Sequence, residues 1–245
     1  MIKELLSSLL RLRFYPLIAW LTLAASAAGF PSAAVQTPSE APYRYLAIGN
    51  SITRHPECVY WWSEAGMAAS TPEQDYFHLV TNYLTEKHAS VAAEAINYVE
   101  WEKAVTDKAS TYSIIDPYLS EDVDLVTVQL SENARMNRGL ERSFKNLLRH
   151  IRKKCPNAQV ILVDDFWSDA KSAAKKKAAE SLKIPFADLS DIRGKEEYKQ
   201  TVGGAVYGSD GEMHFIDLEN VANHPNDAGM EAIAQAIIRQ IEKTE

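Results

Sequence analysis

The residues with the clearest chemical potential follow the first apolar run after the N-terminal segment. That run, Tyr45 to Ile48, ends on Gly49, Asn50 and Ser51. A serine becomes a nucleophile only when a base takes its proton and donors stabilise the oxyanion that forms. We therefore treat Ser51 as a candidate nucleophile, and we expect Gly49 to permit the turn that presents it.

The base for such a serine should be a histidine, and the chain has six: His55, His78, His88, His150, His214 and His224. The three between 78 and 150 fall in or near predicted helices, where packing or surface roles are the simpler interpretation. His55 is too close to Ser51 in sequence to fold back onto it, and no motif surrounds His214. His224 precedes the last predicted helix, in a loop that can reach a sheet edge, so we predict that it is the base.

An oxyanion also needs hydrogen-bond donors that are already in place. Asn133 follows a run rich in β-branched residues, and Asn97 ends another predicted strand. Backbone N–H groups at a helix start after Ser51 would add further donors. Asparagine is also common in caps and turns, so a purely structural role stays open for each carboxamide.

The elements that must position these side chains alternate along the chain. Short apolar runs predict strands at 43–49, 90–99, 123–131, 158–166 and 184–190. Apolar residues at helical spacing predict helices at 72–89, 139–154, 171–183 and 228–242. This alternation predicts an α/β fold, a three-layer α/β/α sandwich with a mostly parallel five-stranded sheet. Functional residues gather beyond the carboxyl ends of such strands, where Ser51, Asn97 and Asn133 would lie.

The bulk composition is that of a globular protein, with 46% hydrophobic and 24% charged residues in 245. The net charge is −7, and no basic stripe with interleaved aromatic residues supports nucleic acid as a partner. We interpret the basic run at 171–180 as a solvated helix face. Cys58 and Cys155 are far apart in sequence and are predicted to be separate thiols. No cluster has clear metal-ligand spacing, so we predict neither metal nor cofactor.

The N-terminus has the pattern of a secretory signal. Basic residues precede a short apolar run and then small residues, and the run is short for a bilayer span and contains Pro16. We predict a signal peptide at 1–34, cleaved near Ala27 or Ala34. A flexible lead-in at 35–42 and one domain at 43–245 follow. The mature protein is then secreted or periplasmic, without membrane contact after cleavage.

Taken in order, these segments resemble the SGNH (GDSL-type) hydrolase family over nearly all of the mature chain, and specifically a secreted bacterial subgroup with a GNSIT nucleophile block. Gly49-Asn50-Ser51 looks like the first block, with Asn50 in place of an aspartate. Ser131-Glu132-Asn133 looks like the Gly-x-Asn block, and His224-Pro225 like the end of the Asp-x-x-His-Pro block. The resemblance implies an SGNH/flavodoxin-like sheet, with Ser51 as nucleophile and His224 as general base.

The same resemblance implies the rest of the site. The oxyanion donors would be the Ser51 N–H, the Asn133 side chain and the backbone of Val99, which stands at the position of a family glycine. Asn50 and Asn97 would hold these residues in position without touching the substrate. Val221 stands where the family has the aspartate that orients the base. A Ser51–His224 dyad is therefore implied, or a triad completed by a main-chain oxygen, Asp217 or Glu219.

The implied activity is a serine esterase acting on small acyl esters, with acetyl groups on carbohydrate as one class. Two alternatives stay open: a non-hydrolytic, carbohydrate-binding or degenerate domain, and an O-acyltransferase that uses the same residues. A glycoside hydrolase is a minority hypothesis, based on Glu100, Glu102 and Glu132 at neighbouring strand ends. Trp61 and Trp62 line a substrate cleft or belong to the core. An α/β-hydrolase elbow, Gly-x-Ser-x-Gly, fits worse, because Thr53 occupies its last position.

Overall fold

The structure is a computed structural model that describes residues 41–104, 108–135 and 139–244. The predicted signal peptide at 1–34 and most of the lead-in at 35–42 lie outside the described residues. The first strand, β1 (Tyr43–Gly49), begins where the predicted domain begins. Within the described ranges, no helix combines the length and the apolar character needed to cross a membrane.

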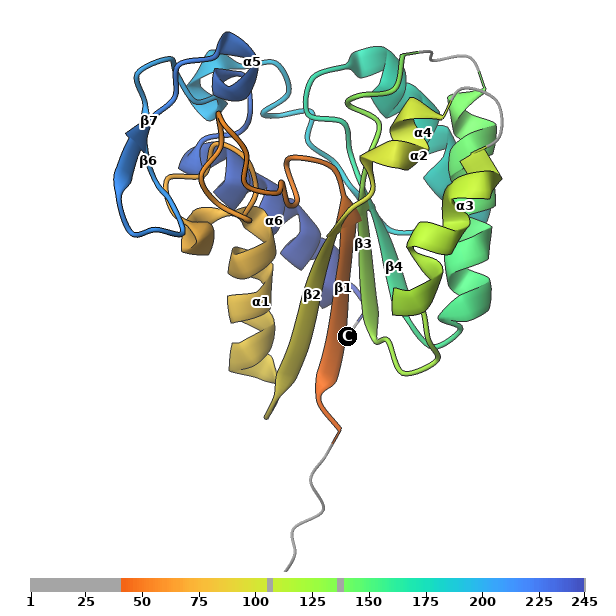
Figure 1. The fold of residues 1–245 in the computed structure, drawn as a ribbon. Coiled ribbons are helices and arrows are strands. Elements are labelled where there is room, and N and C mark those ends of the chain that lie inside the picture. The colour runs from red at the N-terminus through yellow and green to blue at the C-terminus, as the bar shows by residue number, and fades with distance from the viewer. Residues whose placement is uncertain (1–40, 105–107, 136–138, 245) are drawn as a thin grey trace, which may run out of the picture. The chain divides into compact units, whose positions relative to one another are not determined.

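The central sheet has five parallel strands in the order β2-β1-β3-β4-β5 (Figure 1). The other strands are β2 (Val91–Asn97), β3 (Leu125–Gln129), β4 (Gln159–Val163) and β5 (Phe186–Ala187). Gly49 at the end of β1 is in register with Asn97 on one side and Gln129 on the other. This is the flavodoxin-like order, and its topological switch point lies between β1 and β3. The predicted α/β fold with a parallel five-stranded sheet is confirmed.

Helices cover both faces of the sheet, with α1 and α6 on one face and α2, α3 and α4 on the other (Figure 1). Their bounds are α1 (Tyr76–Lys87), α2 (Val99–Lys103), α3 (Leu140–Lys154), α4 (Asp169–Leu182) and α6 (Asp227–Glu242). Ala47 of β1 packs in one apolar cluster with α1 and α6, whereas Ile48 packs in the other with α3 and α4. Successive side chains of a strand point to opposite faces, so strands covered on both faces are continuous apolar runs.

Most predicted elements have different bounds in the structure, and the strand predicted at 184–190 is reduced to β5 (Phe186–Ala187). Two of the differences have a clear local cause. The helix predicted at 72–89 is a short 3₁₀ helix, η1 (Pro72–Gln74), followed by α1. Asp75 separates them, because its backbone is extended and its side chain caps α1 by accepting the His78 N–H. The strand predicted at 90–99 ends at Asn97, where the Tyr98 N–H donates to the Gly49 carbonyl and α2 begins.

Several short elements were not predicted: η2 (Lys108–Ile114), η3 (Asp116–Tyr118), η4 (Glu196–Tyr198), an antiparallel pair β6 (Ala205–Tyr207) and β7 (Met213–Phe215), and α5 (Glu219–Ala222). The β6–β7 pair, α5 and the loop after β1 enclose a third apolar cluster, which includes Trp61 and Val221. Trp61 is therefore a core residue, while Trp62 stacks on His214 with ring centroids 4.5 Å apart. Cys58 and Cys155 are free thiols, as predicted.

Candidate active site

Ser51 lies at the carboxyl end of β1, in a tight turn that Asn50 organises. The Asn50 carbonyl accepts the N–H groups of Thr53 and Arg54, each at 3.0 Å, and its side-chain oxygen accepts the Ile52 N–H at 3.0 Å. Gly49 is required for space: an added Cβ would lie 1.8 Å from the Thr53 Oγ1 atom. The expectation that Gly49 supplies conformational freedom is thus corrected to a steric requirement.

His224 lies directly against Ser51. The distance between the Ser51 Oγ and His224 Nε2 atoms is 2.8 Å, although the residues are 173 positions apart. The other ring nitrogen, Nδ1, is 2.9 Å from the Asn220 carbonyl oxygen. Because a carbonyl can only accept, Nδ1 carries the hydrogen and Nε2 presents its lone pair to the serine. The ring is in the tautomer that a general base for Ser51 requires.

The surroundings of His224 keep its imidazole neutral. The residue is 8% exposed, and burial lowers the pKa of His224 from 6.5 to about 4. The Trp167 ring meets the imidazole edge to face, with centroids 5.3 Å apart, and its Nε1–H donates to the Asn223 carbonyl at 3.0 Å. Sequence reasoning missed Trp167, whose only signal was its place just after a predicted strand.

The group that orients His224 is a main-chain oxygen, one of three options left open by the sequence. Val221 stands where the resemblance places an aspartate, but it is 1% exposed and packs in the third apolar cluster. α5 carries both the Asn220 carbonyl and Val221. The helix therefore presents backbone to the imidazole and an aliphatic side chain to the core.

A pocket of about 380 Å³ opens beside the imidazole, lined by Asn133, Trp167, Asn220, Asn223 and His224. The Asn133 side chain donates one Nδ2 hydrogen to Glu102 Oε2 at 2.8 Å. A carboxamide has two such hydrogens, and the described residues offer no acceptor that is bonded to the second one.

The backbone donors differ in availability. Within the described ranges, no hydrogen bond involves the Ser51 N–H. The Val99 N–H is engaged, because it donates to Asn97 Oδ1 at 3.1 Å. Asn97 in turn donates its side-chain amide to the Arg54 carbonyl at 2.7 Å, so it supports the loop after Ser51.

Two glutamates, the buried Glu102 and the half-buried Glu132, contact the loops that carry Ser51 and Asn133. The Asn50 Nδ2 atom is 3.0 Å from Glu102 Oε1 and 2.8 Å from Glu132 Oε2. Glu132 also accepts from Gln129 Nε2 and the Phe166 N–H. Burial, followed by the nearby Asp165 charge, raises the pKa of Glu132 to about 8.

These contacts give the acidic residues no arrangement for glycoside hydrolysis. Both oxygens of Glu102 and of Glu132 accept hydrogen bonds within the protein, whereas Glu100 is exposed on α2. Two free carboxyl groups flanking a sugar are therefore lacking at these three positions. Among the described residues, no cluster of acidic, histidine or cysteine side chains is arranged to hold a metal ion.

The lysine run of α4 is only partly solvated. Lys175 is 0% exposed, and its Nζ donates to the Leu130 carbonyl at 2.6 Å. Lys171 donates to the Glu132 carbonyl at 2.8 Å. These two lysines are four residues apart and share one helix face, which packs under the loop that carries Asn133. The interpretation of the run as a solvated face was wrong for them.

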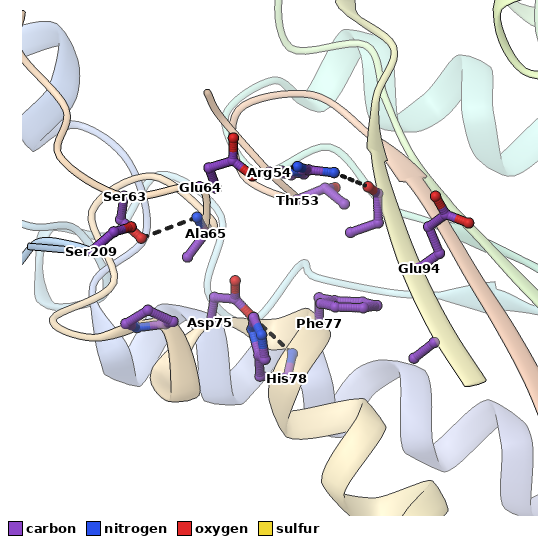
Figure 2. A pocket seen from close by; sticks show the side chains of 13 residues that line it. Thr53, Arg54, Ser63, Glu64, Ala65, Asp75, Phe77, His78, Glu94 and Ser209 are labelled. Atoms are coloured by element: carbon purple, nitrogen blue, oxygen red, sulfur yellow. Dashed lines mark hydrogen bonds and ion pairs between the residues drawn. The ribbon is translucent and has the colours of Figure 1, made fainter. Parts of the chain in front are cut away.

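A second pocket, of about 340 Å³, lies between the loop after Ser51, the start of α1 and β2. Figure 2 shows Asp75 and His78 on one side of it and Arg54 on the other. Asp75 Oδ1 accepts a hydrogen bond from His78 Nδ1 at 2.8 Å, and this bond raises the pKa of His78. Neither Ser51 nor His224 lines this pocket, whereas His224 lines the other one.

The remaining histidines have structural contacts. His55 bonds to the Pro56 carbonyl at 2.7 Å, and His150 bonds to Asp116 at 2.6 Å. His88 caps the end of α1 and stacks on Tyr43.

No protein-family model matches this sequence, and no curated protein matches it. Among solved structures, a two-domain esterase (CEX) active on acetylated mannans is 17% identical, with a TM-score of 0.50 over 82% of this chain. The match covers 49% of that esterase, so this chain spans about half its length. Phospholipase A1 from Streptomyces albidoflavus NA297 is 13% identical, with a TM-score of 0.51 over 82% of this chain and 100% of its own. LAE5, an alpha/beta hydrolase enzyme from the metagenome of Lake Arreo, Spain, is 15% identical. Its TM-score is 0.53 over 82% of this chain and 95% of its own. This chain therefore has a fold that occurs in ester-hydrolysing enzymes.

Proposed function

We propose that this protein is a serine esterase that hydrolyses small acyl esters through an acyl-enzyme on Ser51. The observation that carries the proposal is the 2.8 Å contact between Ser51 Oγ and His224 Nε2 at the switch point of the sheet. A serine and an imidazole in the correct tautomer meet there, and the Ser51 N–H and one Asn133 amide hydrogen have no partner among the described residues. Acyl transfer needs such a nucleophile, base and donors.

The reaction proceeds in two halves. Ser51 Oγ bonds to the ester carbonyl carbon while its proton passes to His224 Nε2. The tetrahedral intermediate collapses, the bond to the alcohol oxygen breaks, and His224 returns the proton to the leaving alcohol. Water then attacks the acyl-enzyme, giving one proton to His224, and Ser51 recovers that proton as the acid leaves.

The proposed oxyanion donors are the Ser51 N–H and the second Nδ2 hydrogen of Asn133. Val99 is not included, because its N–H is already bonded to Asn97. Each donor of this kind is typically worth about 100-fold to 1000-fold in kcat.

Acetyl groups on carbohydrate are the substrate class that we propose to test first. The pocket beside His224 is lined by an aromatic residue, Trp167, and three asparagines. Such groups suit a sugar ring, which has an apolar face and hydroxyl groups around its rim. We also propose that the protein acts outside the cytoplasm, on the basis of the basic, apolar and small-residue pattern of its first 34 residues.

The decisive experiment compares wild type and S51A in turnover of p-nitrophenyl acetate. S51A should lose turnover while keeping its circular-dichroism spectrum and melting temperature. Undiminished turnover by folded S51A would refute the proposal. Labelling of wild type, but not of S51A, by a fluorophosphonate would argue against a non-hydrolytic domain. Product analysis with an added sugar acceptor separates hydrolysis from acyl transfer.

A further inference from the structure

We infer that Glu102 is a positioning residue that holds the Asn133 carboxamide in place as an oxyanion donor. The inference rests on the proposed function, since it concerns how the oxyanion site of that reaction is built. Glu102 lies on α2, is 2% exposed and does not line the pocket beside His224. It therefore acts through another residue and does not touch the substrate.

The contacts of Glu102 converge on the loop after β3. One oxygen, Oε2, accepts the Asn133 Nδ2–H at 2.8 Å, and the other, Oε1, accepts the Ser131 N–H. The Asn133 N–H approaches the same Oε1 at 3.4 Å. One carboxylate thus holds both the backbone and the side chain of the loop, which fixes the position and the rotation of the Asn133 carboxamide.

The residue before the nucleophile completes this arrangement. Asn50 points its NH₂ group at the two glutamates and its Oδ1 at the Ile52 N–H. A carboxylate at position 50 would instead place a third acid beside Glu102 and Glu132. The same carboxamide therefore shapes the Ser51 turn and links Ser51 to the Glu102–Asn133 pair.

Further hydrogen bonds fix the loop after β3, which carries Ser131 and Asn133. The Ser131 hydroxyl donates to Asp165 at 2.6 Å, and Lys175 and Lys171 bond to the carbonyls on either side of Ser131. Misplacement of a reacting group by about 1 Å can cost about 100-fold in rate, so such a frame has kinetic value. In addition, a bond to a charged acceptor polarises the amide and strengthens its second N–H as a donor.

The test is E102Q, with E100Q as the matched control on the exposed side of the same helix. Glutamine keeps the shape but replaces one acceptor oxygen with a donor, which must face a donor of the loop. We expect E102Q to lower kcat for p-nitrophenyl acetate by about 10-fold to 100-fold, with KM nearly unchanged. E100Q should have the same kcat and the same KM as wild type.

A double-mutant cycle with N133A separates positioning from general structural damage. If Glu102 acts through Asn133, E102Q should cost little in an N133A background. Full additivity, or an E102Q rate equal to that of E100Q, would overturn the inference while leaving the esterase proposal intact. An S51A variant as active as wild type would overturn both.

A second measurement needs no variant and holds if E102Q fails to fold. Phosphonylation of Ser51 by a fluorophosphonate mimics the tetrahedral intermediate, and side-chain amide NMR follows the two Asn133 Nδ2 hydrogens. We expect one resonance to shift on labelling while the other, bonded to Glu102, stays in place. Equal shifts of both, or rapid solvent exchange of both, would refute a fixed carboxamide.

Discussion

Lowering the pH tests the proposed base directly, because His224 accepts a proton from Ser51 only while its imidazole is neutral. Burial lowers the pKa of His224 from 6.5 to about 4. The partner of Nδ1 is the Asn220 carbonyl, and a carbonyl dipole offsets less of the lost hydration than a carboxylate charge would. We therefore expect the acid limb of kcat/KM near pH 4.

The size of the effect is large enough to measure at one pH. The shift in the pKa of His224 corresponds to about 3 kcal/mol, at about 1.4 kcal/mol per unit. At about pH 5, an imidazole with an ordinary pKa would be about 3% neutral, whereas one with a pKa of about 4 is about 90% neutral. The two cases differ by about 30-fold in rate.

The assay is kcat/KM for p-nitrophenyl acetate between about pH 3 and pH 8 at constant ionic strength, because this parameter reports the free enzyme. The product is read at a wavelength where its absorbance does not depend on pH, and S51A supplies the background. Samples held at each pH and returned to neutral pH show whether any loss is reversible. An acid limb near pH 6.5 in protein that stays folded would refute the reasoning.

The same pKa shift predicts a stability effect with a defined sign. The unfolded chain takes up a proton on His224 near pH 6.5, but the folded chain does so only near pH 4. The stability contribution is thus fully present above pH 6.5 and is lost as the pH falls through about 4. The difference in unfolding free energy between wild type and H224N should shrink by about 3 kcal/mol over that range.

Two further predictions concern the loops that carry the site. G49A should lower the free energy of unfolding in urea by about 3 kcal/mol, because its Cβ would meet Thr53 and, at 2.8 Å, the Gln129 carbonyl. Ser131 has a φ of 127°, a conformation that glycine tolerates. Both S131G and S131A lose the hydroxyl bond, but S131G should be more stable by about 1–3 kcal/mol, because only glycine relieves the backbone. Equal urea midpoints for the two Ser131 variants would contradict this account.

The sheet was predictable because its strands are short apolar runs bounded by turn residues, and most of them alternate with helical patterns. The predicted ends of helices and strands were wrong where a side-chain hydrogen bond sets the end of the element. Asp75 ends one helix and caps the next, and the Asn97 side chain accepts the Val99 N–H where β2 gives way to α2. The β6–β7 pair has three residues in each strand, too few for a periodic signal.

Ser51 and His224 were predictable as partners because an ordered set of segments placed both at the carboxyl edge of the sheet. The Asn220 carbonyl was not, since every residue has a main-chain oxygen and only the fold selects one. The sequence marks Glu102 as an acid near a strand end. Its partner Asn133 is 31 residues away, and the sequence alone does not show that the two side chains touch. The lysine run identified a charged helix without showing which face packs inward.

The acids around this site lie behind the proposed oxyanion donors and not behind the base. A carboxylate behind an imidazole stabilises the imidazolium and raises its pKa, whereas the Nδ1 atom of His224 faces the Asn220 carbonyl. A carboxylate behind a carboxamide fixes and polarises a donor, as Glu102 does for Asn133. His224 is therefore a weaker base, but its imidazole stays neutral at lower pH. The oxyanion donors must then contribute more of the transition-state stabilisation. Changes at Glu102 or Asn133 should then lower kcat at every pH and leave the acid limb set by His224 where it is.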